Sequence, residues 1–180
     1  MDILSCALGV KKDSRQIFLA DTKKKNDVLK AIEQQLLENK DIILEKNKLD
    51  VELAKKNGMS ESLIDRLILN SSRIEQIAKS IEKVINLKDP VGTTVFGRVC
   101  ENGLKIEKVR VPFGVVGIIY EARPNVTVDA AVLCLKSGNA VFLKGGESMQ
   151  DMWELMKMVR YSNLYDYPKY KWYSEYSSCK

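Results

Sequence analysis

The chain contains no histidine among its 180 residues. This absence excludes catalysis by a Ser-His-Asp or Cys-His arrangement, an HExxH metal site and any imidazole base supplied by these residues. Chemistry carried out by the chain would therefore depend on Cys, Lys, Glu, Asp or Tyr, or on groups from another source.

Cysteine is scarce and scattered. The four cysteines, Cys6, Cys100, Cys134 and Cys179, form no CxxC pair. This spacing argues against a zinc site and against a disulfide framework. We interpret the cysteines as reduced thiols, which predicts a cytoplasmic location. Because Cys134 lies among leucines in a predicted helix, we expect it to be a small core residue and not a nucleophile.

Long apolar runs are missing as well. No stretch reaches the roughly 18 apolar residues that a membrane helix needs, and the first twelve residues lack the basic and apolar regions of a signal peptide. The net charge is +5, and lysines are interspersed with acidic residues along predicted helices. We therefore expect a solvated surface, with neither a membrane nor a nucleic acid as partner.

The length of the chain fits one domain, or one domain plus a fragment of a second. Residues 1–88 are predicted to be helical. Their apolar residues recur at helical spacing, and Asp89-Pro90 ends this region. We expect these residues to serve as scaffold. The helices are predicted from Asp21-Thr22 onward, from near Asp41 to Gly58, from Ser60 to Leu67, and after a capping box formed by Ser72 and Glu75.

A hairpin is predicted next. Residues 93–100 and 104–111 alternate and are rich in β-branched residues, and Asn102-Gly103 between them is a strong hairpin signal. Such a ribbon is not stable alone. We therefore expect it to lie against another sheet or another subunit.

The following residues predict a parallel βαβ unit. VVGII (115–119) and AVFLK (140–144) are apolar runs typical of buried parallel strands, and residues 126–137 have helical spacing between them. Ligands bind at the carboxyl ends of parallel strands in such sheets. These ends carry Tyr120 to Asn125 after the first strand and Lys144 to Glu147 after the second.

Two residues at the first strand end have alternative interpretations. The Asn125 amide can donate to a developing oxyanion, or the residue can cap the following helix. Arg123 can bind a carboxylate or a phosphate with its planar guanidinium, or it can form a structural salt bridge with Glu121.

The second strand end suggests a cofactor contact. Lys144 can meet the ribose or phosphate of a cofactor, because Gly145 and Gly146 allow a close approach of the backbone. The pattern is neither GxGxxG nor a Walker loop.

At these residues the chain resembles a known family. VRVPFGVVGIIYEARPNVTVDAAVLCLKSGNAVFLKGG (109–146), supported by GMSESLIDRLILNSSRIEQIAKSIEKVINLKDPVG (58–92), resembles the amino-terminal part of the γ-glutamyl phosphate reductases. These enzymes are part of the aldehyde dehydrogenase superfamily. The combination of YEARPNVT with LKSGNAV separates them from ordinary aldehyde dehydrogenases. The resemblance covers about residues 1–147.

The resemblance implies an activity. The family reduces L-glutamyl 5-phosphate to L-glutamate 5-semialdehyde with NADPH and releases phosphate, in proline biosynthesis. By position, Asn125 is similar to the asparagine of the oxyanion hole, and Lys144 is similar to the lysine that contacts the cofactor ribose. Glu147 falls where an acid in the superfamily holds both ribose hydroxyls and favours NAD over NADP. Arg123 as a substrate ligand is our own hypothesis.

The resemblance also implies a division of the chain and a homo-oligomer. Residues 1–89 are expected to be the helical part of a cofactor-binding domain, 90–112 an arm that joins subunits, and 113–147 the first βαβ unit of the dinucleotide-binding sheet. The fold class is therefore α/β, with an incomplete cofactor-binding domain. The family's nucleophilic cysteine lies far downstream of this region, and none of the four cysteines matches it. We therefore expect the 180-residue chain to be inactive as a reductase by itself.

The last segment, 148–180, differs from the family. It holds both tryptophans and six of the seven tyrosines. We interpret it as the product of a frameshift. The alternatives are an evolved cap over the open sheet and an aromatic-basic segment that stacks on single-stranded nucleic acid. If it is a cap, a helix near 152–159 is expected to cover part of the sheet edge.

Overall fold

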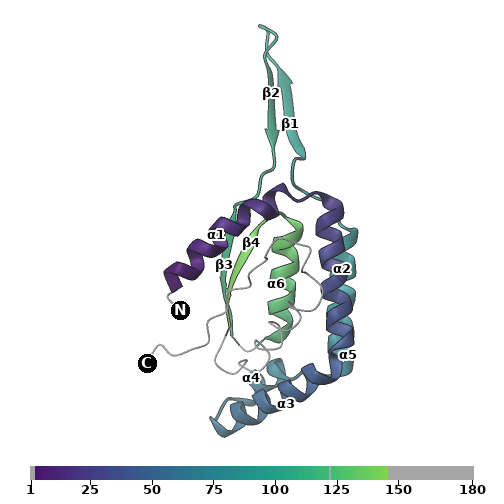
Figure 1. Ribbon diagram of the computed structural model, residues 1–180, viewed down its shortest axis with the longest axis vertical. Coiled ribbons are helices and arrows are strands. Elements are labelled where there is room, and N and C mark those ends of the chain that lie inside the picture. The colour runs from purple at the N-terminus through teal and green to yellow at the C-terminus, as the bar shows by residue number, and fades with distance from the viewer. Residues whose placement is uncertain (1–2, 122, 146–180) are drawn as a thin grey trace.

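The computed structural model of the chain describes residues 3–121 and 123–145 (Figure 1). Among these residues six helices and two of the four strands form a body, and the other two strands protrude from it as one hairpin. In chain order the elements are α1 (Ile3–Leu19), α2 (Thr22–Glu38), α3 (Lys40–Lys56), α4 (Glu61–Leu67), α5 (Ser71–Asn86), β1 (Thr94–Val99), β2 (Lys105–Val109), β3 (Val115–Ile119), α6 (Pro124–Lys136) and β4 (Ala140–Lys144). The predicted α/β class, with helices, then a hairpin, then a βαβ unit, is confirmed.

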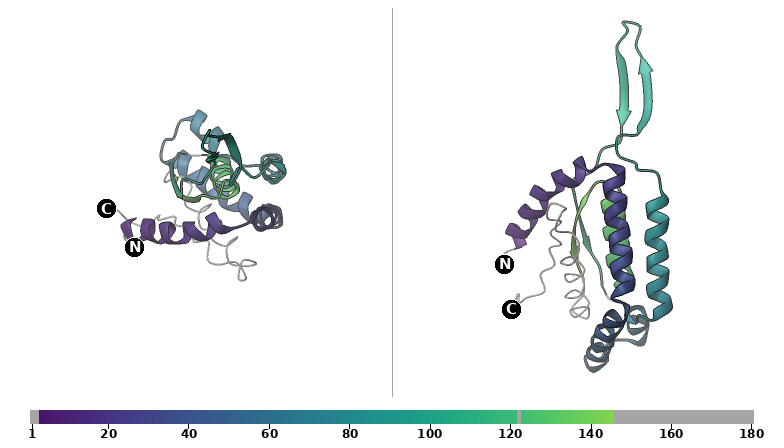
Figure 2. Two further views of the ribbon diagram at one scale, coloured as in Figure 1. Left: turned by 90° about the horizontal axis from the view of Figure 1, so that it is seen from above. Right: turned by 45° about the vertical axis from the view of Figure 1, so that its right-hand side comes forward.

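The main core lies between α2, α5 and α6. Helices α2 and α5 run side by side, as the two right-hand helices of Figure 2 show, and α5 also packs on α6. α5 has an apolar stripe at helical spacing, of which Ile74 and Ile81 are fully buried. Burial of an isoleucine side chain contributes about 1.5–3 kcal/mol. A second, smaller core of Ala54, Leu67 and Leu143 joins α3 and α4 to β4.

Two helix starts test the capping predictions. Asp21 caps α2 as predicted, because its side chain accepts a hydrogen bond from the Lys24 N–H at 2.7 Å. The predicted capping box of Ser72 and Glu75 is wrong. The N-cap of α5 is Asn70, whose Oδ1 accepts from the Arg73 N–H at 2.8 Å. Because Asn70 ends the preceding extended segment, the helix begins at Ser71, and Ser72 already lies inside its first turn.

The hairpin is confirmed where it was predicted. β1 and β2 pair in antiparallel fashion, and Gly103 takes the positive φ of 83° that the tight turn requires. Every residue of both strands is exposed. Within the described residues the ribbon forms a sheet of its own and does not lie against β3 and β4. Contact with another subunit stays a prediction.

The βαβ unit positions the candidate site. β3 and β4 pair in parallel, with Ile119 opposite Lys144 in the register. Helices α1 and α6 both pack against β4. The prediction that β3 is buried on both faces is wrong for the described residues, because β4 is the one strand that pairs with it there and the Ile119 side chain is 81% exposed.

Buried charged side chains tie the helices to the base of the hairpin. Lys25 on α2 is 1% exposed, and its Nζ donates to both oxygens of Asp89 at 2.9 and 3.2 Å. Lys136 at the end of α6 is equally enclosed and donates to Asn26 Oδ1 at 2.7 Å and to the Ile85 carbonyl at 2.8 Å. Asp89 also accepts from the N–H of Val91, which leads into the hairpin. These bonds fix the ends of α2, α5 and α6 relative to one another.

Among residues 3–121 and 123–145, the structure contains no helix that is long and apolar enough to cross a membrane.

Candidate functional site

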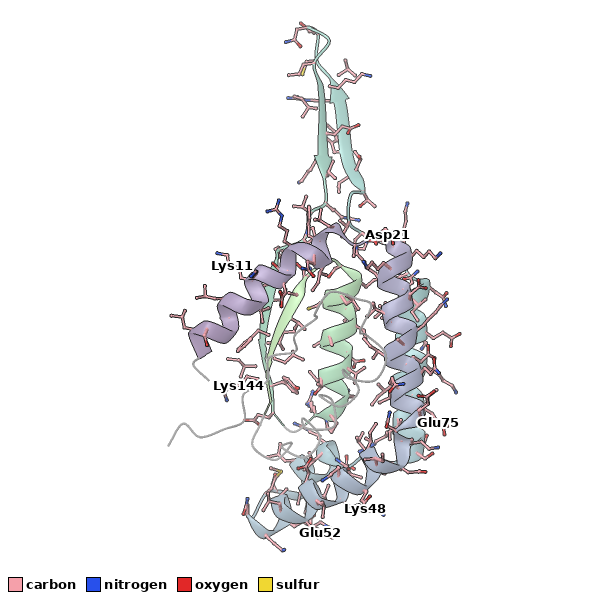
Figure 3. All side chains as sticks on the ribbon, in the orientation of Figure 1. Lys11, Asp21, Lys48, Glu52, Glu75 and Lys144 are labelled. Atoms are coloured by element: carbon pink, nitrogen blue, oxygen red, sulfur yellow. The ribbon has the colours of Figure 1, made fainter. Side chains whose placement is uncertain are left out.

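The two strand ends that carry the predicted site residues lie at one edge. The Tyr120 N–H donates to the Lys144 carbonyl at 3.0 Å, which holds the ends of β3 and β4 together. Lys144 stands at this edge in Figure 3. The parallel pairing therefore brings the described members of the two groups of predicted residues to the same edge of the sheet, as the sequence predicted.

The chain turns sharply from β3 into α6. Pro124 occupies the first position of α6, where its fixed φ suits a helix start and its missing N–H costs nothing. Arg123 is the N-cap residue, with an extended φ of −142°, and its side chain makes no capping hydrogen bond. The alternative that Asn125 caps the helix is therefore wrong. Asn125 lies within the first turn and is exposed.

Arg123 has no ion pair with Glu121, so the alternative of a structural salt bridge is not present in the described part of the chain. Both side chains are exposed. Among residues 3–121 and 123–145, no acid forms an ion pair with the Arg123 guanidinium, a group that suits an anionic ligand.

Arg123 and Asn125 line a cavity of about 420 Å³ between the first turn of α6 and the α4–α5 connection. This volume is within the range of small-molecule sites. The charged and polar side chains that line it are Asp65, Arg66, Arg73, Gln76, Ser80, Arg123, Asn125 and Asp129. The pattern of the sequence did not indicate that α5 faces this cavity, because the contact joins residues about fifty positions apart.

One wall of the cavity is braced by Arg73. Its Nη1 donates to the carbonyls of Asp65 and Ile68, both at 2.6 Å. Asn47 of α3, which is buried, donates to the Leu67 carbonyl at 2.9 Å and accepts from the Leu69 N–H at 2.7 Å. These bonds satisfy backbone groups of the connection after α4 and fix its path.

The opposite wall is the first part of α6. Asn125 and Asp129 are four residues apart on this helix and therefore lie on one face. Asp129 is half-buried, and its Oδ1 accepts a hydrogen bond from Ser80 of α5 at 3.2 Å. The same hydroxyl lies 2.7 Å from the Ile77 carbonyl, so its single proton is shared between two acceptors, and the contact places Asp129 beside α5 at the cavity.

The Tyr120 hydroxyl forms a hydrogen bond with the hydroxyl of the buried Thr127. The bond spans the turn that carries Arg123 and Asn125, and so it fixes where that turn leaves the sheet. The sequence pattern did not predict a role for Thr127. Its position within the helix gave no signal beyond the nearby tyrosine.

Lys144 does not line the cavity. It is exposed at the end of β4, and Gly145 after it is buried. Gly146 and Glu147, the other predicted cofactor residues, lie outside the described residues. An exposed ammonium group beside buried backbone fits a cofactor ribose or phosphate, which needs a cationic donor and close backbone approach.

Cys134 is 8% exposed in α6, which confirms its place in the core. Burial raises the pKa of its thiol. A thiol with a raised pKa holds less thiolate at neutral pH, which disfavours it as a nucleophile.

The chain was compared with protein-family models, with curated proteins and with solved structures. No family model matches. A γ-glutamyl phosphate reductase of Pasteurella multocida is 56% identical over 126 residues, which are 70% of this chain and 30% of that relative. One from Vibrio vulnificus is 45% identical over 161 residues, 89% of this chain and 39% of the relative. A match of 161 residues is longer than residues 1–147, so it extends into 148–180.

Solved structures show the same relationship. The crystal structure of the γ-glutamyl phosphate reductase from Thermotoga maritima matches with a TM-score of 0.84 and 44% identity, over 88% of this chain and 38% of that one. A putative aldehyde dehydrogenase from Bacillus subtilis matches with a TM-score of 0.61 and 18% identity, over 87% of this chain and 33% of that one, which shows the fold alone.

The fold is therefore one found in aldehyde dehydrogenase-like proteins. Within that class, the chain is homologous to the γ-glutamyl phosphate reductases. It spans about a third of the length of the curated relatives that it matches. The domain boundaries and the frameshift origin of residues 148–180 stay predictions.

Proposed function

We propose that these residues act in a γ-glutamyl phosphate reductase, which reduces L-glutamyl 5-phosphate to L-glutamate 5-semialdehyde and phosphate with NADPH in proline biosynthesis. The homology to reductases of that name supports the proposal. The observation that carries it is the position of Asn125, which lines the cavity from the first turn of α6 and does not cap that helix.

The proposed role of Asn125 is to stabilise an oxyanion. Attack on the acyl carbon of the substrate places negative charge on its carbonyl oxygen, and a fixed amide N–H beside that oxygen stabilises the charge. The N-terminal end of α6 favours a negative charge for the same reason, through its unpaired backbone N–H groups. Asn125 thus acts in the transition state more than in substrate binding.

Arg123 is the proposed ligand for a substrate carboxylate or phosphate. It lines the same cavity two residues before Asn125. We expect Arg123→Ala to raise the KM for the phosphorylated substrate in an intact enzyme and to leave the KM for NADPH unchanged. An unchanged affinity for the substrate would remove this role.

For the cofactor, we propose that Lys144 contacts the ribose, with Gly145, Gly146 and Glu147 around it. A bound nicotinamide cofactor supplies the hydride. The ammonium group of Lys144 orients and holds it. Glu147 would hold the ribose hydroxyls, a contact that favours NAD over NADP, so the affinities for NADH and NADPH need direct comparison.

The 180 residues alone are expected to be inactive. By resemblance the family's nucleophile is not among the four cysteines, and without a thiolate no thioester can form. We expect no oxidation of NADPH when the purified chain is mixed with L-glutamyl 5-phosphate. Oxidation at the rate of a reductase would overturn this expectation. The cytoplasmic location also stays a prediction.

A second candidate function is binding to reductase subunits without catalysis. The observation that favours it is the hairpin, where large apolar side chains such as Phe96 and Val99 are more than half exposed. Exposed ribbons of this kind recruit partner strands. If the chain acts in this way, it should co-elute with a full-length reductase, and Phe96→Glu should abolish the co-elution.

The reductase proposal is tested by segment exchange. Residues 3–145 replace the homologous segment of the Thermotoga maritima reductase, giving what we call the exchange enzyme. We expect the exchange enzyme to oxidise NADPH in the presence of L-glutamyl 5-phosphate. A folded exchange enzyme that binds cofactor but has no such activity would contradict the proposed function.

A further inference from the structure

The cavity between α4, α5 and α6 is lined by more charged side chains than are needed to stabilise an oxyanion and to bind one anionic group of a substrate. Two arginines, Arg66 and Arg123, line it without an ion pair within the described part of the chain. Asp129 lines it as well, with Oδ1 accepting from Ser80. A cavity that presents both guanidinium and carboxylate groups suits a ligand that itself carries both signs of charge.

Arg73 and Asp65 also line the cavity, but their charged groups already have partners at its wall. Arg73 already donates to the Asp65 and Ile68 carbonyls, and its Nη2 lies 3.4 Å from Asp65 Oδ1. The two residues are paired with each other at the wall. Asp129 is therefore the carboxylate of the cavity that is not matched by an arginine among the described residues.

We infer that Asp129 binds the α-ammonium group of the substrate, while Arg66 binds its α-carboxylate, so that the cavity selects an α-amino acid. This inference rests on the proposed function, which supplies the glutamyl ligand and places its acyl group at Asn125. Asp129 is then a residue that determines specificity, and its contact with Ser80 Oγ, whose one proton is shared with the Ile77 carbonyl, keeps it beside α5.

The spacing along α6 supports the glutamyl length. Four residues of α-helix advance about 6 Å, which separates Asp129 from Asn125 along the axis. Four bonds, each of about 1.5 Å and arranged in a zigzag, join the acyl carbon of a glutamyl group to its α-nitrogen and cover a comparable distance. An aspartyl group has one bond fewer and spans a distance shorter by about 1.3 Å.

The test measures binding to the 180-residue chain by calorimetry, so that no catalysis is required. The probes are L-glutamate, L-aspartate and glutarate, which is glutamate without its ammonium group. We expect L-glutamate to bind about tenfold more tightly than either of the others, as the loss of one hydrogen bond to a charged group predicts. Equal binding of glutarate and L-glutamate, or no binding of L-glutamate, would overturn the inference.

Asp129→Asn keeps the shape and the capacity to accept from Ser80 but removes the charge. We expect it to abolish the preference for L-glutamate over glutarate, while Arg66→Gln weakens both. Glu82→Gln is the control, since Glu82 is an exposed acid on α5 outside the cavity, and it should leave the preference unchanged. Circular dichroism at the binding temperature establishes that each variant is folded. A preference that survives in Asp129→Asn, or that Glu82→Gln removes equally, would contradict the assignment.

The binding experiment can fail or succeed independently of the activity test of the proposed function. Selective binding of L-glutamate by the chain, together with an inactive exchange enzyme, would support the amino-acid site and reject the reductase. An active exchange enzyme whose chain binds glutarate as well as L-glutamate would support the reductase and reject the role of Asp129.

Discussion

The substitution Asp89→Asn should destabilise the folded chain more than the neutralisation of any exposed charged side chain. The Asp89 carboxylate accepts from Lys25 Nζ at 2.9 and 3.2 Å, from Thr22 Oγ1 at 2.9 Å and from the Val91 N–H at 3.0 Å. The Lys25 side chain is 1% exposed, whereas that of Asp89 is 11% exposed. Removal of the acid therefore leaves a buried ammonium without a counter-charge.

The expected magnitude follows from this burial. Removal of one partner of a buried ion pair costs about 3–5 kcal/mol. Because Asp89 keeps some access to water, and asparagine still offers one oxygen, we expect about 3 kcal/mol. This loss is a large share of the roughly 5–15 kcal/mol by which a domain is stable.

Urea denaturation at neutral pH, followed by circular dichroism, measures the change in the free energy of unfolding. The double variant Lys25→Met/Asp89→Asn is the critical comparison, because it removes both charges. We expect it to be more stable than the sum of the two single variants predicts, by about 2 kcal/mol or more. A loss below about 1 kcal/mol for Asp89→Asn, or strict additivity in the cycle, would refute the reasoning.

Further predictions concern the stability of the folded chain. Gly138→Ala should cost about 1–3 kcal/mol, because Gly138 has a φ of +76° and an added Cβ would lie 2.8 Å from Pro112 Cγ; thermal unfolding measures this cost. Asn47→Ala should cost about 2 kcal/mol or more, since it leaves the buried Leu67 carbonyl and the partly buried Leu69 N–H without their partner. Asn47→Asp, which keeps one acceptor, should cost less. The pH dependence follows from Asp89: burial raises the pKa of its carboxyl, but the hydrogen bonds from Lys25, Val91 and Thr22 outweigh burial and lower the pKa below its usual value. An acid whose pKa is lowered in the folded state stabilises the protein fully above its unfolded-state pKa, about 3.9, and this stabilisation is lost as the pH falls through the folded-state pKa. The urea concentration at the unfolding midpoint should therefore decrease when the pH drops below about 4. The decrease should be smaller in Asp89→Asn.

Much of the fold was predictable from local signals. Asp21 marked the start of α2, the Asn102-Gly103 pair marked the hairpin turn, and two apolar runs marked the parallel strands. Each of these signals acts within a few residues of the structure that it specifies. The start of α5 was misplaced because Asn70 and Ser72 are both good capping residues, and sequence alone does not decide which backbone position ends the extended segment.

The candidate site was predictable in part. The rule that ligands bind at the carboxyl ends of parallel strands located Arg123, Asn125 and Lys144 at one edge. It did not predict that Arg123 and Asn125 share a cavity with Arg66 and Asp129 while Lys144 lies outside it. That arrangement depends on how α5 packs against α6, which is a tertiary contact without a local signature. The exposure of β3 was missed for the same reason, since an apolar run does not say which neighbours cover it.

The most direct test of the central claim is the kcat of the exchange enzyme with Asn125→Ala. If Asn125 stabilises the oxyanion, kcat should fall by about 10²- to 10³-fold, while the KM for NADPH stays unchanged and the variant folds normally. An unchanged kcat, or a loss seen in KM alone, would contradict the account of this cavity as the reaction site of a γ-glutamyl phosphate reductase.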